Sequence, residues 1–275
     1  MENLHPMEEV LGKGKNIWTI KGAFDIHTGD MISFVGAGGK TTLMFAMAGE
    51  IVAPDGLVIT TCTTKIYPPS ESDTPNIFLS PDANEIIEFI QKKGNDLRHV
   101  TIASEKMAAS GKLKGVHPDV IARLHNLGPV RYILVEADGA AQRPLKAPDT
   151  RFEPVIPPHS SLVIPVVGID ALGCKLDDRA VFRSAIAANL TGTRYGEAVS
   201  LDTMTILITH PLGIIHGSPP HARIVPFINK TDMEQGLSKA RRLASRILEE
   251  GHPQIDRVVL GQARFLPSIT DVITF

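Results

Sequence analysis

The chain has 275 residues, enough for a well-buried core in one large domain or in one domain with a subdomain. Its 43% hydrophobic and 21% charged residues are ordinary for a globular protein, and a formal net charge of −2 provides no overall field to attract nucleic acid or acidic lipid. No apolar run approaches the roughly 20 residues of a membrane span, and the N-terminus has no apolar signal core. We therefore expect a cytoplasmic protein with no membrane or nucleic-acid partner.

The two cysteines, Cys62 and Cys174, are far apart in the chain and belong to no Cys-x-x-Cys or Cys/His cluster. This spacing gives no support for a zinc site. We expect both to be reduced thiols, as is usual in the cytoplasm.

Apolar, β-branched runs alternate with helical patterns along the chain. The predicted strands are nearly continuous apolar runs, which is typical of strands buried on both faces of a parallel sheet. They are residues 31–35, 57–61, 100–103, 132–136, 161–167, 205–209, 224–228 and 256–261. Helices are predicted for residues 41–51, 83–93, 119–126, 179–189 and 233–250. This order predicts an α/β fold, an open and mostly parallel sheet with helices on both faces, in a P-loop NTPase-like three-layer sandwich.

We expect residues 1–275 to form a single P-loop NTPase-like domain. Residues 1–30 are predicted to be a peripheral N-terminal extension, with Trp18 as its anchor. Insertions are expected between about residues 66 and 130 and between about residues 140 and 222. In sheets of this kind, ligands bind at the carboxyl ends of the strands, so the polar motifs that follow predicted strands are the candidate site.

The first predicted strand runs into a glycine-rich turn, GAGGKTT, and a good helix-forming segment follows. Glycines let the backbone bring N–H groups close to a phosphate chain, and the helix N-terminus adds further donors. Lys40 can reach the outer phosphates, and the Thr41 hydroxyl can bind Mg²⁺. We therefore predict that a nucleoside triphosphate binds here, in contact with Gly36, Ala37, Gly38, Gly39, Lys40, Thr41 and Thr42.

This turn is shorter than the usual phosphate loop, G-x-x-x-x-G-K-[ST], because Phe34 occupies the position of the first glycine. It is closer to the GTNGKT form of Mur-type ligases. A ligase of that type would need further substrate and C-terminal domains, which 275 residues cannot hold. The alternative to nucleotide binding is a glycine-rich strand-to-helix turn with no ligand.

Threonines and a lysine follow the second predicted strand, in the run Thr61-Cys62-Thr63-Thr64-Lys65. The carboxyl end of this strand is expected to lie beside the phosphate loop, so these hydroxyls and Lys65 could contact phosphate, metal or substrate. Ordinary strand-forming threonines are an equal alternative.

The predicted strand 132–136 leads into two carboxylates, Glu136 and Asp138. This resembles a Walker B element, in which one carboxylate holds Mg²⁺ and the other orients an attacking water or substrate hydroxyl. Their i, i+2 spacing places both side chains on one face if the strand continues. The pattern does not decide which of the two supports the metal, and a simple Asp-Gly turn is the alternative.

A proline-bounded loop after this strand contains Arg143 and Lys146, with Arg151 shortly beyond. Beside a phosphate site, such cations can bind a small anionic substrate or stabilise a phosphoryl group in transfer. The candidate catalytic residues are Lys40, Glu136, Asp138, Arg143 and Lys146. Arg151 could equally be a solvated surface charge. His210, after the predicted strand 205–209, is a weaker candidate.

The predicted strand 224–228 is followed by Asn229-Lys230-Thr231-Asp232. This is the N-K-x-D pattern with which GTPases recognise guanine, because Asp232 can accept hydrogen bonds from two guanine donors that adenine lacks. Asn229 and Lys230 would brace the phosphate loop and cover the base. The alternative is that Thr231 or Asp232 only caps the predicted helix 233–250. Ala263, after the last predicted strand, stands where GTPases offer a backbone N–H to the base.

Together these motifs resemble the YqeC family, described as accessory proteins of selenium-dependent molybdenum hydroxylases. The resemblance spans about residues 31 to 232. It rests on VGAGGKTTLM (35–44), KIYPP (65–69), VEADGAAQRPLKAP (135–148), VVGIDALG (166–173), THPLG (209–213) and VPFINKTD (225–232). It implies a cytoplasmic nucleotide-binding protein that acts in maturation of these enzymes. The implied partners are a molybdenum-cofactor intermediate and a selenium-dependent hydroxylase apoprotein.

The leading hypothesis is a Mg²⁺-dependent enzyme that hydrolyses GTP or ATP, or that acts as a phosphotransferase or ligase on a small anionic substrate. Thr41, Glu136 and Asp138 would place Mg²⁺, and Arg143 and Lys146 would bind the substrate. A second hypothesis is a nucleotide-switched chaperone or delivery protein with little turnover of its own. Turnover that only a protein partner stimulates would favour the second hypothesis.

Overall fold

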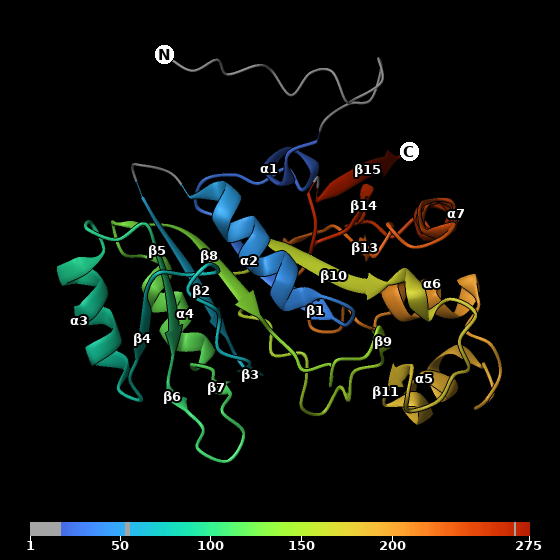
Figure 1. The fold of residues 1–275 in the computed structure, drawn as a ribbon, viewed down its shortest axis with the longest axis horizontal. Helices are drawn as coiled ribbons and strands as arrows, with labels where there is room; N and C mark the ends of the chain where they lie inside the picture. Colours follow the sequence, from blue (N-terminus) through green and yellow to red (C-terminus); the bar gives the residue numbers. More distant parts are fainter. Residues whose placement is uncertain (1–17, 53–55, 267) are drawn as a thin grey trace, which may run out of the picture.

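Ten strands of the described residues form one sheet through the middle of the molecule (Figure 1). The computed structural model describes residues 18–52, 56–266 and 268–275. Nine of these strands follow the spatial order β15-β14-β13-β10-β1-β8-β2-β5-β4, and the tenth, β12, pairs with β10. Within this sheet, β14 and β15 pair in antiparallel fashion, and all other neighbouring strands are parallel. The strands are β1 (Met31–Gly36), β2 (Leu57–Cys62), β4 (Ile77–Leu79), β5 (His99–Ala103), β8 (Val130–Glu136), β10 (Leu162–Gly168), β12 (Arg223–Ile224), β13 (Phe227–Asn229), β14 (Arg257–Gly261) and β15 (Ile269–Thr274).

Helices cover both faces of this sheet, which gives three layers. They are α1 (Ile20–Ala23), α2 (Lys40–Ile51), α3 (Ala83–Lys93), α4 (Pro118–His125), α5 (Ser184–Thr191), α6 (Leu201–Thr209) and α7 (Gly236–Glu249). α1 and α2 pack on one face; α3 and α4, and beside them α5 to α7, pack on the other. Neighbouring residues of β1 alternate accordingly, since Met31 packs with α3 and α4 whereas Ile32 packs with α1 and α2. The predicted α/β fold class is confirmed, and the architecture is consistent with a P-loop NTPase-like fold.

The register of the central strands brings three of the predicted motifs to one edge of the sheet. β1 pairs with β8 so that Phe34 lies opposite Glu136, and with β10 so that Gly36 lies opposite Val166. Every residue of β1 and β10 is buried, as their continuous apolar sequences require. The glycine-rich turn therefore emerges between the carboxyl ends of β8 and β10. β13, which ends at Asn229, is the next strand beyond β10.

Two small sheets flank this edge. The first is antiparallel and consists of β3 (Lys65–Ile66), β7 (Leu113–Lys114) and β6 (Glu105–Lys106), in that order. The second pairs β9 (Leu145–Lys146) with β11 (Val181–Phe182). Strands of two residues have no periodicity that sequence can reveal, and none of these five strands was among the predicted elements.

The predicted strand 205–209 is wrong, because this segment is the second half of helix α6. Its Thr-Ile-Leu-Ile-Thr sequence is β-branched and apolar, and a short apolar run does not distinguish a strand from a buried helix. The helix begins at a cap that the prediction missed. The Ser200 side chain accepts a hydrogen bond from the Thr203 amide, and the Thr203 side chain accepts one from the Ser200 amide.

Three further boundaries differ from prediction. The predicted strand 224–228 is divided at Pro226 into β12 and β13, since proline offers no N–H to the sheet. The helix predicted at 233–250 begins only at Gly236, after turns in which Lys230 and Gln235 have φ of 67° and 58°. The helix predicted at 179–189 is displaced to α5, because β11 occupies residues 181 and 182.

The described part of the N-terminal segment contributes to the core. Ile20 and Ile26 are buried, and Phe24 is buried completely, with its ring centroid 5.9 Å from that of Phe227. Trp18 packs against the same cluster while partly exposed. Ile20, Phe24 and Ile26 are thus part of the folded core rather than peripheral. The rest of the predicted extension, residues 1–17, lies outside the described residues.

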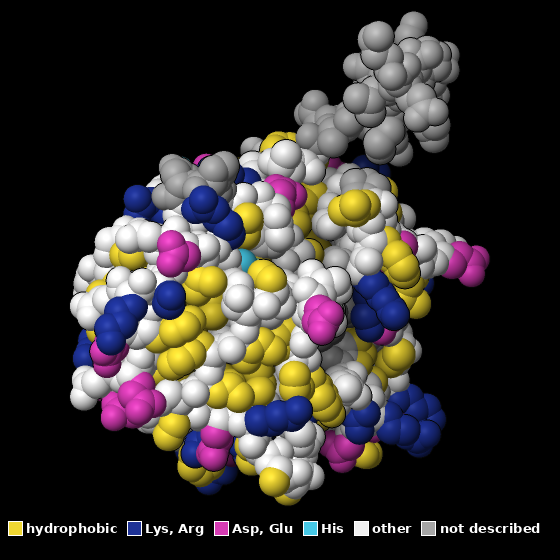
Figure 2. Space-filling view, turned by 60° about the vertical axis from the view of Figure 1, so that its left-hand side comes forward, with side chains coloured by type: hydrophobic (Ala, Val, Ile, Leu, Met, Phe, Trp, Pro, Cys, Tyr) yellow, Lys and Arg dark blue, Asp and Glu magenta, His cyan; other side chains and the backbone are white. Residues whose placement is uncertain are grey.

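The surface on the side of α3 and β4 mixes all side-chain types. Figure 2 shows hydrophobic side chains across the middle of this view, with Lys, Arg, Asp and Glu side chains between and around them. β4 is the last strand at this end of the sheet, and Ile77 and Leu79 on it are exposed. None of the described helices has the length and apolar character needed to cross a membrane.

Candidate nucleotide site

The glycine-rich turn joins β1 to α2 with backbone geometry that suits glycine. Gly38 and Gly39 have φ of 82° and 131°, which side chains rarely tolerate. A Cβ on Gly38 would lie 2.4 Å from the Gly168 nitrogen, and one on Gly39 would lie 2.3 Å from Nδ2 of Asn229. The turn is therefore packed directly against the ends of β10 and β13. This close approach explains why the glycines stand at these positions.

The backbone amides of the turn fall into two groups. Those of Gly36, Ala37 and Gly38 donate to Asp138 Oδ2, to the Val166 carbonyl and to the Arg143 carbonyl, at 2.8 to 3.0 Å. The amides of residues 39–42 have no acceptor among the described residues, since they form the uncapped N-terminus of α2. Of the seven residues predicted to contact phosphate, the last four thus offer free backbone donors. The first three hold the turn in place.

Lys40 lies almost completely buried at the start of α2. Its ammonium donates to the Gly36 carbonyl at 2.7 Å and lies 3.2 Å from Asp138 Oδ1 and 3.7 Å from Glu136 Oε1. Burial alone lowers the pKa of Lys40, but the carboxylates of Asp138 and Glu136 outweigh it and raise the pKa above its ordinary value. Lys40 is therefore charged at neutral pH although only 4% of the residue is exposed.

Glu136 and Thr41 meet at the end of β8. The Thr41 hydroxyl donates to Oε2 of Glu136 at 2.5 Å. Burial raises the pKa of Glu136, an effect that Lys40 and the Thr41 hydroxyl only partly offset. The two side chains predicted to share Mg²⁺ are thus brought together. Hydroxyl and carboxylate oxygens are the ligand types that Mg²⁺ prefers.

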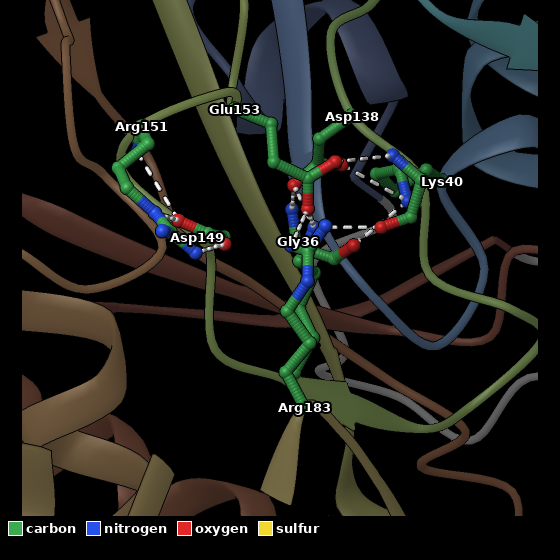
Figure 3. A network of polar contacts seen from close by, with 9 residues as sticks. Gly36, Lys40, Asp138, Asp149, Arg151, Glu153 and Arg183 are labelled. Carbon is green, nitrogen blue, oxygen red and sulfur yellow. Dashed lines mark hydrogen bonds and ion pairs between the residues drawn. The ribbon is translucent and has the colours of Figure 1, made fainter. Parts of the chain in front are cut away.

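Asp138 lies beneath the turn and is completely buried. Its Oδ2 accepts the Gly36 amide at 2.9 Å and pairs with Nζ of Lys146 at 2.9 Å, while Oδ1 forms the ion pair with Lys40 but no hydrogen bond (Figure 3). The carboxylate therefore fixes both the turn and its lysine. Of the two predicted carboxylates, Glu136 faces the cavity described below and Asp138 does not.

Lys146 differs most from its predicted role. It is completely buried, and its ammonium contacts Asp138, the Gly139 carbonyl at 2.6 Å, and Glu153. Glu153 in turn pairs with Arg183 (Figure 3). Lys146 is therefore an internal link in a chain of alternating charges, from Lys40 to Arg183, and does not face solvent or substrate. Sequence reasoning missed Glu153 and Arg183, which no motif marked.

The remaining predicted side chains, Arg143, Arg151 and His210, differ in whether they face the cavity. Arg143 is half-buried and lines the cavity beside the turn. Arg151 is exposed and pairs with Asp149 at 2.7 Å, which, with hydrogen bonds from Arg151, lowers the pKa of Asp149 to about 2. His210 follows α6, where its Nδ1 accepts the Leu212 amide at 3.0 Å, and it lies outside the cavity. Arg151 thus fits its surface alternative.

Within the N-K-x-D segment, Asn229 braces the turn, whereas Lys230 does not contact it. Nδ2 of Asn229 donates to the Gly38 carbonyl at 2.7 Å, and its Oδ1 accepts the Ala263 amide at 2.9 Å. Nζ of Lys230 pairs with Asp170 at 2.6 Å. Asp232 is exposed on a turn, four residues before α7 begins. The alternative that Thr231 or Asp232 caps this helix is wrong, because Gln235 occupies the cap position.

One cavity of about 1000 Å³ connects these groups. We use two names for the residues at the cavity wall and directly behind it: the phosphate end comprises residues 36–42 with Glu136 and Asp138, and the base end comprises residues 229–233 and 262–265. The cavity lining includes Gly38, Gly39, Lys40, Thr41, Thr42, Glu136, Arg143, Asn229, Lys230 and Asp232 from the predicted set. It also includes Lys112, Met233 and Phe265, which sequence reasoning did not single out. Gly36, Ala37, Asp138 and Lys146 support the lining from behind.

Comparison with known proteins identifies the family. The family model of the YqeC protein matches residues 32–185. The chain is 35% identical over 221 residues to the uncharacterized protein YqeC of Escherichia coli (strain K12), which covers 78% of this chain and 81% of that one. The chain belongs to the YqeC family. The whole phosphate end lies within the matched segment, whereas Asn229 to Asp232 of the base end lie beyond it.

The structure of this chain overlaps only weakly with one solved structure. It is described as "The active site of a carbohydrate esterase displays divergent catalytic and non-catalytic binding functions". The match covers 86% of this chain and 60% of that chain, at 9% identity and a TM-score of 0.26. An overlap this low supports no statement about fold or activity.

Proposed function

We propose that this YqeC protein binds GTP in preference to ATP, together with Mg²⁺, and hydrolyses it or transfers its phosphoryl group to a small substrate. The Asn229 side chain supports this most directly, because it bonds the Gly38 carbonyl and the Ala263 amide at the same time. One side chain thereby ties together the two ends of a single cavity. A nucleoside triphosphate offers a polyanion for one end and a base for the other.

The phosphate end supplies positive charge and free donors. The amides of residues 39–42 point from the N-terminus of α2, where the helix dipole favours an anion. Lys40 adds a full charge, because its raised pKa keeps it protonated at neutral pH. Such preorganised groups can stabilise the charge that develops on a phosphoryl group in transfer.

Thr41 and Glu136 are the residues that would hold Mg²⁺. The described residues contain no cluster of three or more His, Cys, Asp or Glu side chains suited to a metal ion. Such a cluster is not needed, since Mg²⁺ is usually bound by one or two protein oxygens, waters and the substrate phosphates. When bound, Mg²⁺ would neutralise charge on the triphosphate oxygens. Asp138 would act behind the lining, by holding Gly36 and Lys40 in place.

The base end supplies the selectivity. Asp232 is exposed at the cavity wall, so its carboxylate is free to accept the two donors of guanine. Met233 and Phe265 line the same end, and both are exposed apolar side chains that can pack against the faces of a base. Adenine would leave the carboxylate unpaired at the cost of its desolvation.

The biological setting is proposed from the family resemblance. YqeC proteins are described as accessory proteins of selenium-dependent molybdenum hydroxylases, so we place the nucleotide-dependent step in the maturation of those enzymes or of their cofactor. A molybdenum-cofactor intermediate or a hydroxylase apoprotein would then be the partner.

Calorimetric titration tests nucleotide choice. We expect GTP with Mg²⁺ to bind wild-type protein at least about tenfold more tightly than ATP, because one base-specific contact contributes about 1–3 kcal/mol. Asp232→Ala should lose this preference. Glu234→Ala, an exposed neighbour outside the cavity lining, should retain it. Equal binding of both nucleotides by wild-type protein would contradict guanine recognition.

Phosphate release tests turnover. Lys40→Ala should reduce nucleotide hydrolysis by at least about 100-fold, the usual cost of removing a group that stabilises transition-state charge. Circular dichroism should show that the variant is folded. Wild-type rates in the folded variant would refute the assignment of Lys40. Wild-type turnover that appears only with a hydroxylase apoprotein present would favour the switched delivery protein instead.

A further inference from the structure

A second cavity of about 780 Å³ adjoins the phosphate end. Lys65, Lys112, Gly139 and Ala141 line both cavities, so they form the shared wall. The volume is in the range of small-molecule sites. Neither the N-K-x-D segment nor the amides of residues 39–42 belong to the second cavity, so a triphosphate in the first cavity leaves it unexplained.

The lining of the second cavity is strongly basic. It includes Lys65, Lys112, Lys114 and Arg183, against a single carboxylate, Glu153. Glu153 is already paired with Lys146 and Arg183. Lys114 pairs with Glu105 at 3.0 Å, but Lys65 and Lys112 form no ion pair with any residue that the structure describes. Two unpaired ammonium groups therefore stand at the wall between the cavities.

The small sheet of β3, β7 and β6 brings these lysines together. Its register places Lys65 directly opposite Lys114, an unfavourable pairing of like charges. Lys112 precedes β7 by one residue, and its ammonium lies 4.5 Å above the ring of Tyr67, which holds it near the shared wall. A fold that gathers like charges at a cavity gains stability when an anion binds there.

The other residues that line the second cavity indicate the chemistry of the rest of the ligand. Val116, Pro118, Val155 and Phe182 provide apolar surface. Thr64 also lines the cavity, and its hydroxyl is buried without a hydrogen-bond partner among the described residues. Orphaned buried polar atoms are rare in folded proteins and call for a partner. The site thus suits a molecule with an apolar body and an anionic group.

We propose that the second cavity binds a small anionic co-substrate with an apolar body, and that Lys65 and Lys112 hold its anionic group beside the phosphate loop. This rests on the proposed function, because the co-substrate would be the molecule on which the bound nucleotide acts. In this proposal, Lys65 and Lys112 take the role of substrate contact that was predicted for Lys146. Lys146 is instead part of the buried chain that joins Asp138, below the phosphate loop, to Arg183 in the second cavity (Figure 3).

Pyridoxal 5′-phosphate is a suitable probe, because it combines an aromatic ring and a phosphate with an aldehyde that reacts with lysine amines. The imine would be trapped with borohydride and located by peptide mass spectrometry. We expect saturable labelling at Lys65 or Lys112, with one equivalent per chain, that persists under saturating GTP analogue and Mg²⁺. Lys65→Gln/Lys112→Gln should lower labelling at half-saturating probe at least tenfold. Lys93→Gln, at an exposed lysine outside both cavities, should leave it unchanged.

Two results would overturn the proposal. One is complete protection of both lysines by the nucleotide, since the probe would then occupy the first cavity. The other is non-saturable labelling spread over exposed lysines such as Lys93. Calorimetry with the same double variant separates this site from nucleotide binding: we expect the loss of probe affinity to exceed the loss of nucleotide affinity at least tenfold. If wild-type protein binds no nucleotide, the proposed function fails, and probe labelling in the absence of nucleotide still reports on the second cavity.

Discussion

The two ends of the candidate nucleotide cavity are built in opposite ways. At the phosphate end the charged side chains are buried and already paired with one another, as Lys40 is with Asp138 and Glu136. At the base end Asp232 lies exposed on a turn, with Met233 and Phe265 exposed beside it. Asn229 connects the two ends, since its side chain bonds both Gly38 and Ala263.

Under the proposed function, this difference would separate affinity for the triphosphate from selectivity between bases. Burying charges is costly unless they are mutually paired, so the phosphate end must be completed by the fold itself. Under the same proposal, the preorganised donors would favour any triphosphate. An exposed carboxylate adds little to folding and is available to discriminate between bases. The following predictions test this contrast, beginning with the largest expected effect.

The reactivities of Cys62, which is buried, and Cys174, which is exposed, can be compared in one experiment. Cys62 lies opposite Glu136 in the sheet, and burial, with the Glu136 charge, raises its pKa to about 12. At pH 8 only about one part in 10⁴ of Cys62 is then thiolate. Cys174 is exposed and donates to the carbonyl of Asp170, the partner of Lys230.

We expect iodoacetamide at pH 8 to alkylate Cys174 at least about a thousandfold faster than Cys62, because the thiolate is the reactive form. Peptide mass spectrometry over time measures both rates. In denaturant the two rates should converge. Similar rates in the folded protein would show that the phosphate end is open.

Lys146→Met should reduce the free energy of unfolding by about 3–5 kcal/mol. The substitution leaves the carboxylates of Asp138 and Glu153 buried without their shared cation. Urea denaturation followed by circular dichroism measures the loss. Lys92→Gln, at the exposed pair with Glu88, is the matched control and should change stability little. A comparably small loss for Lys146→Met would mean that the charge chain is dispensable.

Asn229→Ala should cost about 1–3 kcal/mol of stability, because the Ala263 amide and the Gly38 carbonyl both lose their partner. Nucleotide affinity should fall as well, since the two ends are no longer tied together. The same urea titration, paired with calorimetry, measures both. Asn126→Ala, which removes an exposed hydrogen bond to the Ala122 carbonyl, serves as the control. Loss of nucleotide affinity without loss of stability would place Asn229 in ligand contact only.

Asp232→Ala should have the smallest effect on folding, within about 0.5 kcal/mol of wild type, because the side chain is exposed and caps no helix. Its effect should appear only in the choice between GTP and ATP. A marked loss of stability would show that the base end, like the phosphate end, is part of the folded framework.

Local motifs at strand ends allowed much of the site to be predicted. The glycine-rich turn, Glu136 and Asn229 were found because each follows a buried apolar run, and parallel strands place their carboxyl ends at one edge. The layer order followed from the same alternation of strands and helices. The roles of these residues were harder to predict. For example, the amides of Gly36, Ala37 and Gly38 donate to acceptors within the protein and are not free to bind phosphate.

Contacts between distant, irregular segments could not be predicted in this way. Glu153 contacts both Lys146 and Arg183, and loops and two-residue strands, which carry no periodic signal, bring these residues together. Lys146 therefore looked like a substrate contact. Helix α6 was mistaken for a strand for a different reason, because a β-branched apolar run outweighed the capping signal at Ser200.

The strand order described above also bears on how the chain assembles as it is synthesised. β1 lies at the centre of the sheet, yet its neighbours β8 and β10 begin at residues 130 and 162, about a hundred residues later. The two strands that flank the glycine-rich turn are therefore complete only after about the first 170 residues have been synthesised. β13 and β14, which hold the base end, follow only at residues 227 and 257. During synthesis, the segments that form the phosphate end would therefore be complete before those that form the base end.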